Sequence, residues 1–271
     1  MLKRLLVVVL SVLGVSPCLA GTERNGPAPI CATGFERPDK HGLYQQLKGH
    51  DKLDIVEGKG VGGGSALRAT YEGFPEGSRR IVSDFKLPKR MGEATLVYDV
   101  KFDNNFQFTK GGKLHGLGPD RKITGGNKMK PDGWSARAMW DRSGLYSYVY
   151  SQNKDGKYGE RPDDRLKFDL PKNEYISVSI YVKINHPVDK ANGVVRIYVN
   201  GKGVSEQNGI QFRSVEGEKT GISQLLFSTF HGGNKPSYAP KDKDGNYTDV
   251  HAYFDNLAVY EGLRVREKPG G

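Results

Sequence analysis

The chain has 271 residues, of which 36% are hydrophobic and 27% charged, and its formal net charge is +10. This length permits one large all-β domain or two smaller domains. The basic balance favours an anionic partner without identifying the polyanion, although a basic surface that only maintains solubility is the alternative.

The first 20 residues differ in kind from the rest of the chain. A basic start precedes the apolar run Leu5–Val15, which is too short to span a bilayer, and small residues follow it. This pattern is typical of an export signal, so we predict a signal peptide over residues 1–20 and a secreted or periplasmic protein without stable membrane association. The alternative is a lipoprotein anchored at Cys18, which the proline directly before that cysteine disfavours.

Removal of the signal peptide would take away two basic residues and one cysteine. The net charge would then be +8, and Cys31 would be the remaining thiol, so no internal disulfide could form. Residues 21–30 are polar and contain two prolines, and residues 264–271 are charged and end in Pro-Gly-Gly. We therefore expect a flexible leader over 21–30 and a flexible tail over 264–271.

Short strand-like segments separated by turn residues fill the region between leader and tail. Leu96, Tyr98 and Val100 alternate with more polar neighbours, and no stretch shows a helical period for longer than about two turns. The pair Asn200-Gly201 after another alternating segment is typical of a hairpin turn. We predict an all-β, antiparallel β-jelly roll or β-sandwich as a single domain over residues 31–263. The predicted strands are Ala32–Arg37, Leu53–Glu57, Ser65–Tyr71, Arg79–Phe85, Glu93–Phe102, Trp134–Trp140, Leu145–Tyr150, Tyr175–Ile184, Val194–Val199, Ile210–Arg213, Ile222–Phe230 and His251–Tyr260.

One stretch, Lys110–Tyr150, concentrates residue types that suit an anionic, hydroxyl-rich ligand. It contains the segments KGGKLHGL, GWSARAMW and LYSYVY. Because alternate residues of a strand point to the same face, Ser135 and Arg137 share one face of the second segment. The same rule places three tyrosines on one face of the third segment, namely Tyr146, Tyr148 and Tyr150.

Other polar residues lie close to these segments in the sequence. Lys113 and His115 belong to the first segment, and the polar loop Gly118–Asp132 is a candidate lid or rim of the site. Each residue also has a simpler explanation: tyrosines pair across strands, Arg137 forms surface salt bridges, and single histidines such as His115 and His231 are often structural. Their co-occurrence favours a functional site.

Several kinds of catalytic site are not supported by the sequence. The six histidines show neither HExxH nor close paired spacing, so we expect no metal and no cofactor. The serine motif GxSxG is absent. The faces that carry Arg137 and Tyr148 hold no pair of carboxylates, which weakens the alternative of a glycoside hydrolase.

The residues present match instead what β-elimination on a uronic acid requires. Removing the proton beside a carboxylate becomes easier when a cation neutralises that carboxylate, as Arg137 and Lys113 could do. A base takes the proton and an acid protonates the departing oxygen. Tyr148 and Tyr150 could serve in both roles if neighbouring cations favour the phenolate.

The segments KGGKLHGL, GWSARAMW, YSYVY, FSTFHGG and AYFDNLAVYEG, in that order, closely resemble polysaccharide lyase family fourteen, the alginate and glucuronan lyases. The resemblance runs from about Gly63 to Glu261. It implies a β-jelly roll that cuts acidic polysaccharides and leaves an unsaturated uronic acid end. It also implies catalytic roles for Lys113, Arg137, Tyr148 and Tyr150, with Ser135 orienting the substrate.

Two histidines depart from the family pattern. His115 stands where the family usually has proline, and His231 interrupts a glycine-rich run. Together with Ser135 and Tyr146 we predict them as substrate-binding residues. The function we expect is an exported, monomeric lyase of uronate polysaccharides, alginate first and glucuronan second. A non-catalytic module that binds acidic glycans is the alternative, and nucleic acid is not an expected partner because export and the absence of a concentrated basic motif argue against it.

Overall fold

The computed structural model describes residues 27–142 and 144–271 of the chain. The predicted signal peptide, residues 1–20, and most of the predicted leader lie outside the described residues. None of the helices in the described part of the chain is long and apolar enough to cross a membrane.

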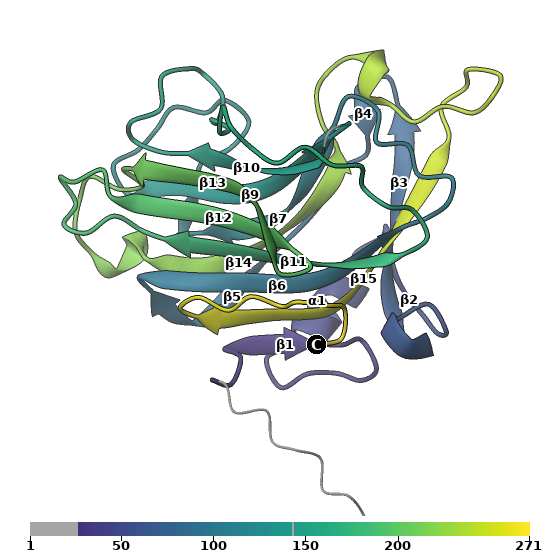
Figure 1. The fold of residues 1–271 in the computed structure, drawn as a ribbon, viewed down its shortest axis with the longest axis horizontal. Helices are drawn as coiled ribbons and strands as arrows, with labels where there is room; N and C mark the ends of the chain where they lie inside the picture. The colour runs from purple at the N-terminus through teal and green to yellow at the C-terminus, as the bar shows by residue number, and fades with distance from the viewer. Residues whose placement is uncertain (1–26, 143) are drawn as a thin grey trace, which may run out of the picture.

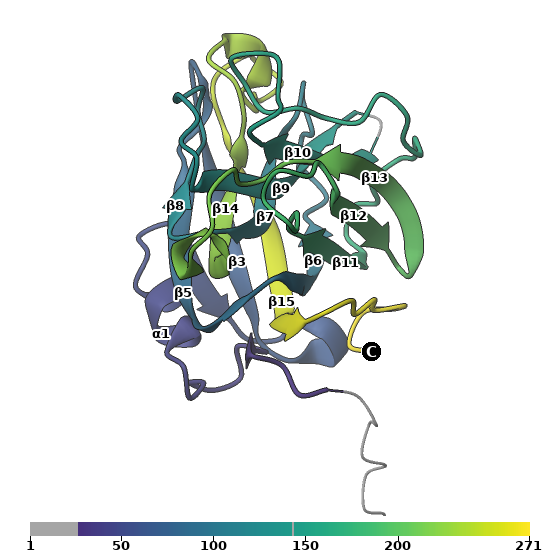
Figure 2. The ribbon, with the colours of Figure 1, turned by 90° about the vertical axis from the view of Figure 1, so that its left-hand side faces the viewer.

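Two curled sheets, built almost entirely from antiparallel pairs, pack face to face, as predicted for a jelly roll (Figures 1 and 2). The larger, nine-stranded sheet has the order β13-β12-β11-β6-β15-β3-β2, with β1 paired to β15 and β4 paired to β3. Its strands are β1 (Cys31–Thr33), β2 (Leu53–Val56), β3 (Ala66–Phe74), β4 (Gly77–Ser78), β6 (Glu93–Phe102), β11 (Tyr175–Lys183), β12 (Gly193–Val199), β13 (Lys202–Ile210) and β15 (Asp249–Glu261).

The smaller, six-stranded sheet has the order β10-β9-β7-β14-β5, and β8 pairs with β9 in the parallel sense. The strands of this sheet are β5 (Ile81–Met91), β7 (Gly112–Gly118), β8 (Arg121–Lys122), β9 (Gly133–Asp141), β10 (Gly144–Tyr150) and β14 (Ile222–His231).

The hydrophobic core lies between the two sheets, because apolar side chains at alternate positions of each strand point towards the opposite sheet. On β12, Val195, Ile197 and Val199 are buried in this core, whereas the residues between them are partly exposed. On β9, Trp134 and Trp140 mark the core face. The intervening residues of β9 therefore point to the face of the six-stranded sheet that lies away from the core, which we call the outer face.

The free thiol of Cys31 also lies in the core. Burial raises its pKa to about 12. A thiolate is the reactive form of cysteine, so this side chain acts as a small apolar residue rather than as a reactive group.

Most predicted strands match observed ones, and the hairpin at Asn200-Gly201 is confirmed, since Val199 pairs with Lys202. The prediction of a strand at Ile210–Arg213 is wrong, because the chain pairs earlier as β13. That strand escaped prediction because it is largely polar and exposed at the edge of the sheet. A short helix, α1 (Leu43–Lys48), begins where the Asp39 carboxylate accepts hydrogen bonds from three backbone N–H groups.

The tail predicted to be flexible is instead bound to the nine-stranded sheet (yellow in Figure 1). The guanidinium of Arg266 donates to the carboxylate of Asp99 over 3.1 Å, and the backbone N–H of Gly270 donates to the same carboxylate over 2.9 Å. Asp99 is fully buried. A charged segment stays flexible when it has no partner in the fold. Here the buried carboxylate of Asp99 is that partner, so the tail is ordered.

Replacing Arg266 with alanine should therefore destabilise the protein. The substitution leaves the Asp99 carboxylate buried without its cation, and breaking a buried ion pair costs about 3 kcal/mol. Urea unfolding should show that loss, whereas Arg264→Ala, at an exposed position of the same tail, should change stability by less than about 0.5 kcal/mol. If Arg266→Ala changed the free energy of unfolding as little as Arg264→Ala does, the tail would not support the fold.

Candidate active site

The outer face of the six-stranded sheet brings the predicted strand residues together. Strands β9 and β10 are antiparallel neighbours in which Tyr148 is paired with Arg137 and Tyr150 with Ser135. The faces predicted from alternation are thus confirmed. Directly paired residues on one face are close enough for their side chains to interact, so phenols and guanidinium form one cluster.

Arg137 is the most unusual charged group of this cluster. Its side chain is only 7% exposed, Nη1 donates a weak 3.4 Å hydrogen bond to Ser228 Oγ, and Nε has no hydrogen-bond partner. Gly116 lies opposite it on β7, where a Cβ would meet the Arg137 side chain, so glycine makes room for it. Burial lowers the pKa of Arg137 to about 10, and it stays a cation at neutral pH.

No carboxylate in the described part of the chain forms an ion pair with Arg137. Burying a cation without a counter-ion lowers the stability of the folded state, so such a residue is expected where the cation has a function. The free Nε–H and the weakly bonded Nη1 could both donate stronger hydrogen bonds to a bound anion. The arrangement therefore suits a carboxylate-bearing ligand, which a guanidinium binds with two parallel hydrogen bonds.

Lys113 lies beside Arg137 on the neighbouring strand β7, paired with Met139 of β9. Its Nζ is 5.5 Å from the centre of the Tyr148 ring and 5.3 Å from that of the Phe230 ring. Burial, and then the positive charges of Arg137 and Arg80, lower the pKa of Lys113 to about 8. A lysine with this pKa has a substantial neutral fraction at mildly alkaline pH, so it can accept a proton.

The two tyrosines are held by the loops that border the outer face. The backbone N–H of Gly159 donates to the Tyr148 hydroxyl over 3.0 Å, and that of Gly126 donates to the Tyr150 hydroxyl over 2.9 Å. Gly126 belongs to the loop predicted to be a lid or rim, so that loop does reach the site. Burial, together with the neighbouring Tyr150 hydroxyl, raises the pKa of Tyr148, which is therefore a proton donor at neutral pH.

Ser135 and Tyr146 lie on the same outer face with their polar groups engaged. The Ser135 hydroxyl donates to the backbone oxygen of Ile123 over 2.6 Å and is almost fully buried. The Arg165 guanidinium packs on the Tyr146 ring, 4.5 Å from its centre. Both side chains form part of the framework around Arg137, and substrate binding by either stays a prediction.

The prediction that His115 binds substrate is wrong. The side chain is fully buried and stacks on Phe227, 3.9 Å between ring centres, in the core between the sheets. Simple alternation places Lys113 and His115 on one face, but the pairing of β7 with β9 shifts by one residue between Lys113 and Gly116. This β-bulge turns His115 to the core face, where its Nδ1 accepts a hydrogen bond from the backbone N–H of Ser228.

His115 should make the protein sensitive to acid. Burial lowers its pKa to about 3, whereas an unfolded histidine titrates near 6.5. Between these values the unfolded chain binds more protons, so stability is lost as the pH falls from about 6.5 towards 3. His115→Phe should reduce the difference in unfolding free energy between pH 7 and pH 4 by about 3 kcal/mol, measured by urea unfolding. An unchanged difference would contradict this placement.

The prediction that His231 binds substrate is also wrong. Its ring is buried among Tyr71, Phe106 and Trp140, and its Nε2 bonds to the backbone oxygen of Gln107 over 2.6 Å. The residue before it, Phe230, occupies the outer face instead and contacts Lys113. Sequence reasoning missed Phe230, because the signal that finds it is alternation with His231 along β14 once His231 is known to be buried.

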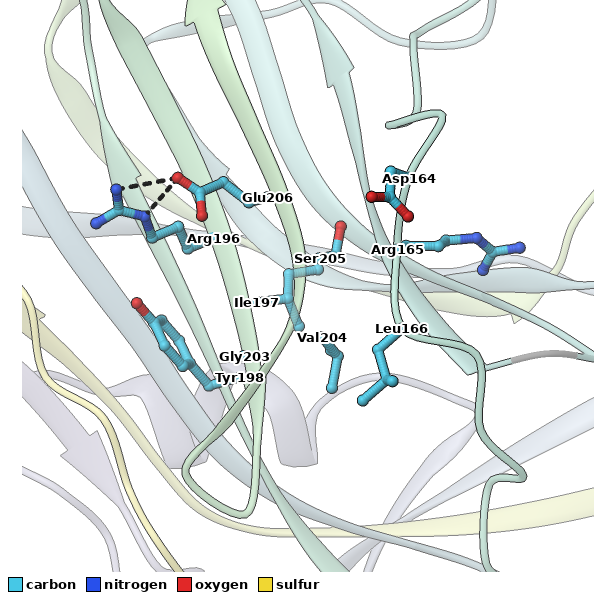
Figure 3. Close-up of a pocket in the computed structure, with 10 residues that line it drawn as sticks. All are labelled: Asp164, Arg165, Leu166, Arg196, Ile197, Tyr198, Gly203, Val204, Ser205 and Glu206. Carbon is cyan, nitrogen blue, oxygen red and sulfur yellow. Dashed lines mark hydrogen bonds and ion pairs between the residues drawn. The ribbon is translucent and has the colours of Figure 1, made fainter.

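A separate pocket of about 260 Å³ lies on strands β12 and β13 (Figure 3). It is lined by Tyr198, Leu166 and Asp164, among others, and includes none of the predicted site residues. Its Arg196 is already paired with Glu206 over 3.0 Å. This pocket therefore offers no unpaired cation comparable with Arg137. No group of three or more potential metal ligands occurs among residues 27–142 and 144–271.

Comparison with known proteins identifies the family. The Polysaccharide lyase 14 pattern matches residues 72–257, a span that contains every residue of the cluster around Arg137. The chain belongs to this family. It is therefore a polysaccharide lyase. No curated protein sequence matches the chain significantly.

Solved structures show the same fold at low sequence identity. The PL-14 alginate lyase from Aplysia kurodai is 23% identical, with a TM-score of 0.68 over 87% of this chain and 100% of that chain. Alginate lyase vAL-1 from Chlorella virus is 19% identical, with a TM-score of 0.64 over 87% and 100% of the two chains. The endo-beta-1,4-glucuronan lyase from the fungus Trichoderma reesei is 17% identical, with a TM-score of 0.55 over 83% and 96%.

Proposed function

We propose that this lyase cleaves a uronate polysaccharide by β-elimination, with alginate as the first candidate substrate and glucuronan as the second. The observation that carries the proposal is the buried, unpaired guanidinium of Arg137 next to the depressed-pKa ammonium of Lys113. Such a pair requires an anion, and each sugar of these polymers carries one. The alginate and glucuronan lyases of similar fold support the same substrate class.

In the proposed reaction Arg137 binds the carboxylate of the sugar at the cleavage point. Neutralising that carboxylate stabilises the carbanion that forms beside it. A base removes the proton from C5, the electron pair forms the C4–C5 double bond, and the bond from C4 to the glycosidic oxygen breaks. The departing oxygen takes a proton from an acid. The products are a new hydroxyl end and an unsaturated uronate end.

The sequence-based hypothesis gives both proton transfers to Tyr148 and Tyr150, but the electrostatics favour a different division. Lys113, whose pKa is lowered to about 8, is the better base because near pH 8 a large fraction of the protein molecules carry it as the neutral amine. Tyr148, whose pKa is raised, stays protonated and suits an alkoxide leaving group, which is itself a strong base. We therefore assign Lys113 as base and Tyr148 as acid, with Tyr150 and Ser135 as positioning residues.

Export also belongs to this proposal. A uronate polymer is too large to enter a cell unaided, and the first 20 residues have the pattern of a signal peptide. Fractionation of cells that express the full chain, followed by mass determination of the mature protein, tests it. A start at Gly21 outside the cytoplasm is expected, and an intact N-terminus in the cytoplasm would contradict export.

Tyr148→Phe tests the assignment of Tyr148 as the proton donor. Loss of the proton donor should lower the turnover number by about 100-fold or more, while retardation in an alginate affinity gel should persist because the binding cations are intact. If the wild-type protein bound alginate but created no new chain ends, the chain would be a binding module. Tyr44→Phe, on helix α1, is the matched control and should keep wild-type turnover.

A further inference from the structure

A row of side chains crosses the outer face of the six-stranded sheet at right angles to the strands. Tyr146 pairs with Met139, Met139 with Lys113, and Lys113 with Phe230 across β10, β9, β7 and β14. On the last strand, β5, Ile81 pairs with Thr229, so the preceding residue, Arg80, lies next to Phe230. The row therefore continues from the cleavage centre to the β5 edge.

Arg80 and Phe230 form a unit at that edge. The Arg80 guanidinium carbon is 5.6 Å from the centre of the Phe230 ring, and the Lys113 ammonium is 5.3 Å from the centre of the same ring. The Phe230 ring is thus flanked by two cations. The effect of Arg80 on the pKa of Lys113 shows that the two charges are within electrostatic reach of each other.

The position of Arg80 is fixed by its neighbours. Ser78 Oγ accepts a hydrogen bond from the backbone N–H of His231, and the backbone N–H of Arg79 donates to the backbone oxygen of Glu72. Gly77 packs so closely on His231 that a Cβ there would lie 2.5 Å from its carbonyl oxygen. The buried His231 therefore secures the strand end that presents both Phe230 and Arg80.

The charge on Arg80 is exposed and available. No acidic side chain in the described part of the chain forms a salt bridge with it, and the carboxylate of Asp84, on the same strand, is paired with Lys122. Strands lie about 4.8 Å apart, so the backbone of Arg80 is about 10 Å from that of Lys113 measured across the sheet. Phe230 lies between the two residues in the row, so we expect Arg80 to meet a different sugar of the same chain from the one at the cleavage point.

We propose that Arg80, exposed at the β5 edge, forms a second uronate-binding position, in which its guanidinium binds a sugar carboxylate and the buried Phe230 ring beneath it holds the guanidinium in place. This inference rests on the proposed function, because it concerns the same polymer lying across the same face. It makes the enzyme selective for runs of consecutive uronates. A chain in which the sugar at this position lacks a carboxylate loses one charge-assisted hydrogen-bonded contact.

Kinetics of Arg80→Gln on the best uronate polymer test the proposal. Measured at alkaline pH where the rate has levelled off, so that the effect of Arg80 on the pKa of Lys113 does not enter, the KM should rise about tenfold, the size expected for loss of one exposed charge pair with its hydrogen bonds, while kcat changes by less than about twofold. Arg80→Lys should recover part of the loss, because it keeps the charge but not the planar fork. Arg37→Gln, between β1 and α1 at the opposite end of the molecule from β4, is the control and should match the wild type (Figure 1).

The outcomes separate this inference from the proposed function. If the wild-type enzyme is active and Arg80→Gln has the same KM as Arg37→Gln, the second position does not exist and the cleavage centre stands. If the wild-type enzyme forms no unsaturated product from any uronate polymer, the proposed function fails. In that case affinity-gel retardation of Arg80→Gln, compared with wild type, decides whether Arg80 binds the polymer, and equal retardation would overturn the inference.

Discussion

Lys113→Met is expected to lower kcat/KM by about 1,000-fold, because the variant has no group at the base position. For the wild-type enzyme, kcat/KM should rise with pH and level off above about 8, the pKa to which burial and the nearby arginines lower Lys113. Steady-state kinetics between pH 6 and pH 10 measure both effects. A rate that falls as the pH rises through 8 would show that Lys113 acts only as a cation.

The same substitution should make the protein more stable. The folded pKa of Lys113 is about 8 and the unfolded value 10.5, so below pH 8 the folded state bears the full cost of burying the charge. Between these values the unfolded chain binds more protons, and the cost disappears as the pH rises. Lys113→Met should therefore add about 3 kcal/mol to the free energy of unfolding at pH 7. Lys110→Met, at an exposed position of the same segment, should change neither activity nor stability.

Arg137→Gln is expected to lower kcat/KM by about 1,000-fold. The substitution removes the charge that stabilises the developing carbanion, and loss of one such group typically costs two to three orders of magnitude. Arg137→Lys should recover little, because an ammonium cannot make the two parallel hydrogen bonds of a guanidinium. The variant Arg90→Gln, which breaks only an exposed ion pair with Asp120, should retain full activity.

Stability decides between a functional and a structural role for Arg137. Because its guanidinium is buried without a carboxylate partner, Arg137→Gln should not lower the free energy of unfolding. A large loss of stability together with the loss of activity would mean that Arg137 supports the fold. Wild-type kcat/KM in Arg137→Gln would contradict its place at the substrate carboxylate.

The central strand pair of the site could be predicted from sequence because it depends on local alternation. Ser135 and Arg137 alternate along β9, the tyrosines alternate along β10, and a short turn makes these strands antiparallel neighbours. The lysine on β7 was also recognised, although that strand was not predicted as such. Hydrophobic period and turn length are properties of a few consecutive residues, so a single sequence reveals them.

The features that could not be predicted from the sequence depend on contacts between segments that are distant in the chain. The bulge that turns His115 into the core is set by the pairing of β7 with β9, and no local sequence pattern predicts it. Arg80 joins the outer face because its neighbour Ile81 on β5 pairs with Thr229 of β14, 148 residues later in the chain. The ordered tail follows from the buried Asp99, whose partner Arg266 cannot be identified from composition.

The most direct test of this active site is the ultraviolet absorbance of unsaturated uronate. Purified protein would be incubated with alginate, polymannuronate, polyguluronate and glucuronan in parallel, each with Arg137→Gln as the control. We predict a steady rise in absorbance with at least one polymer, faster at pH 8.5 than at pH 6.5, and almost none with the variant. No rise with any of the four polymers, or an equal rise with the variant, would contradict the assignment of this site.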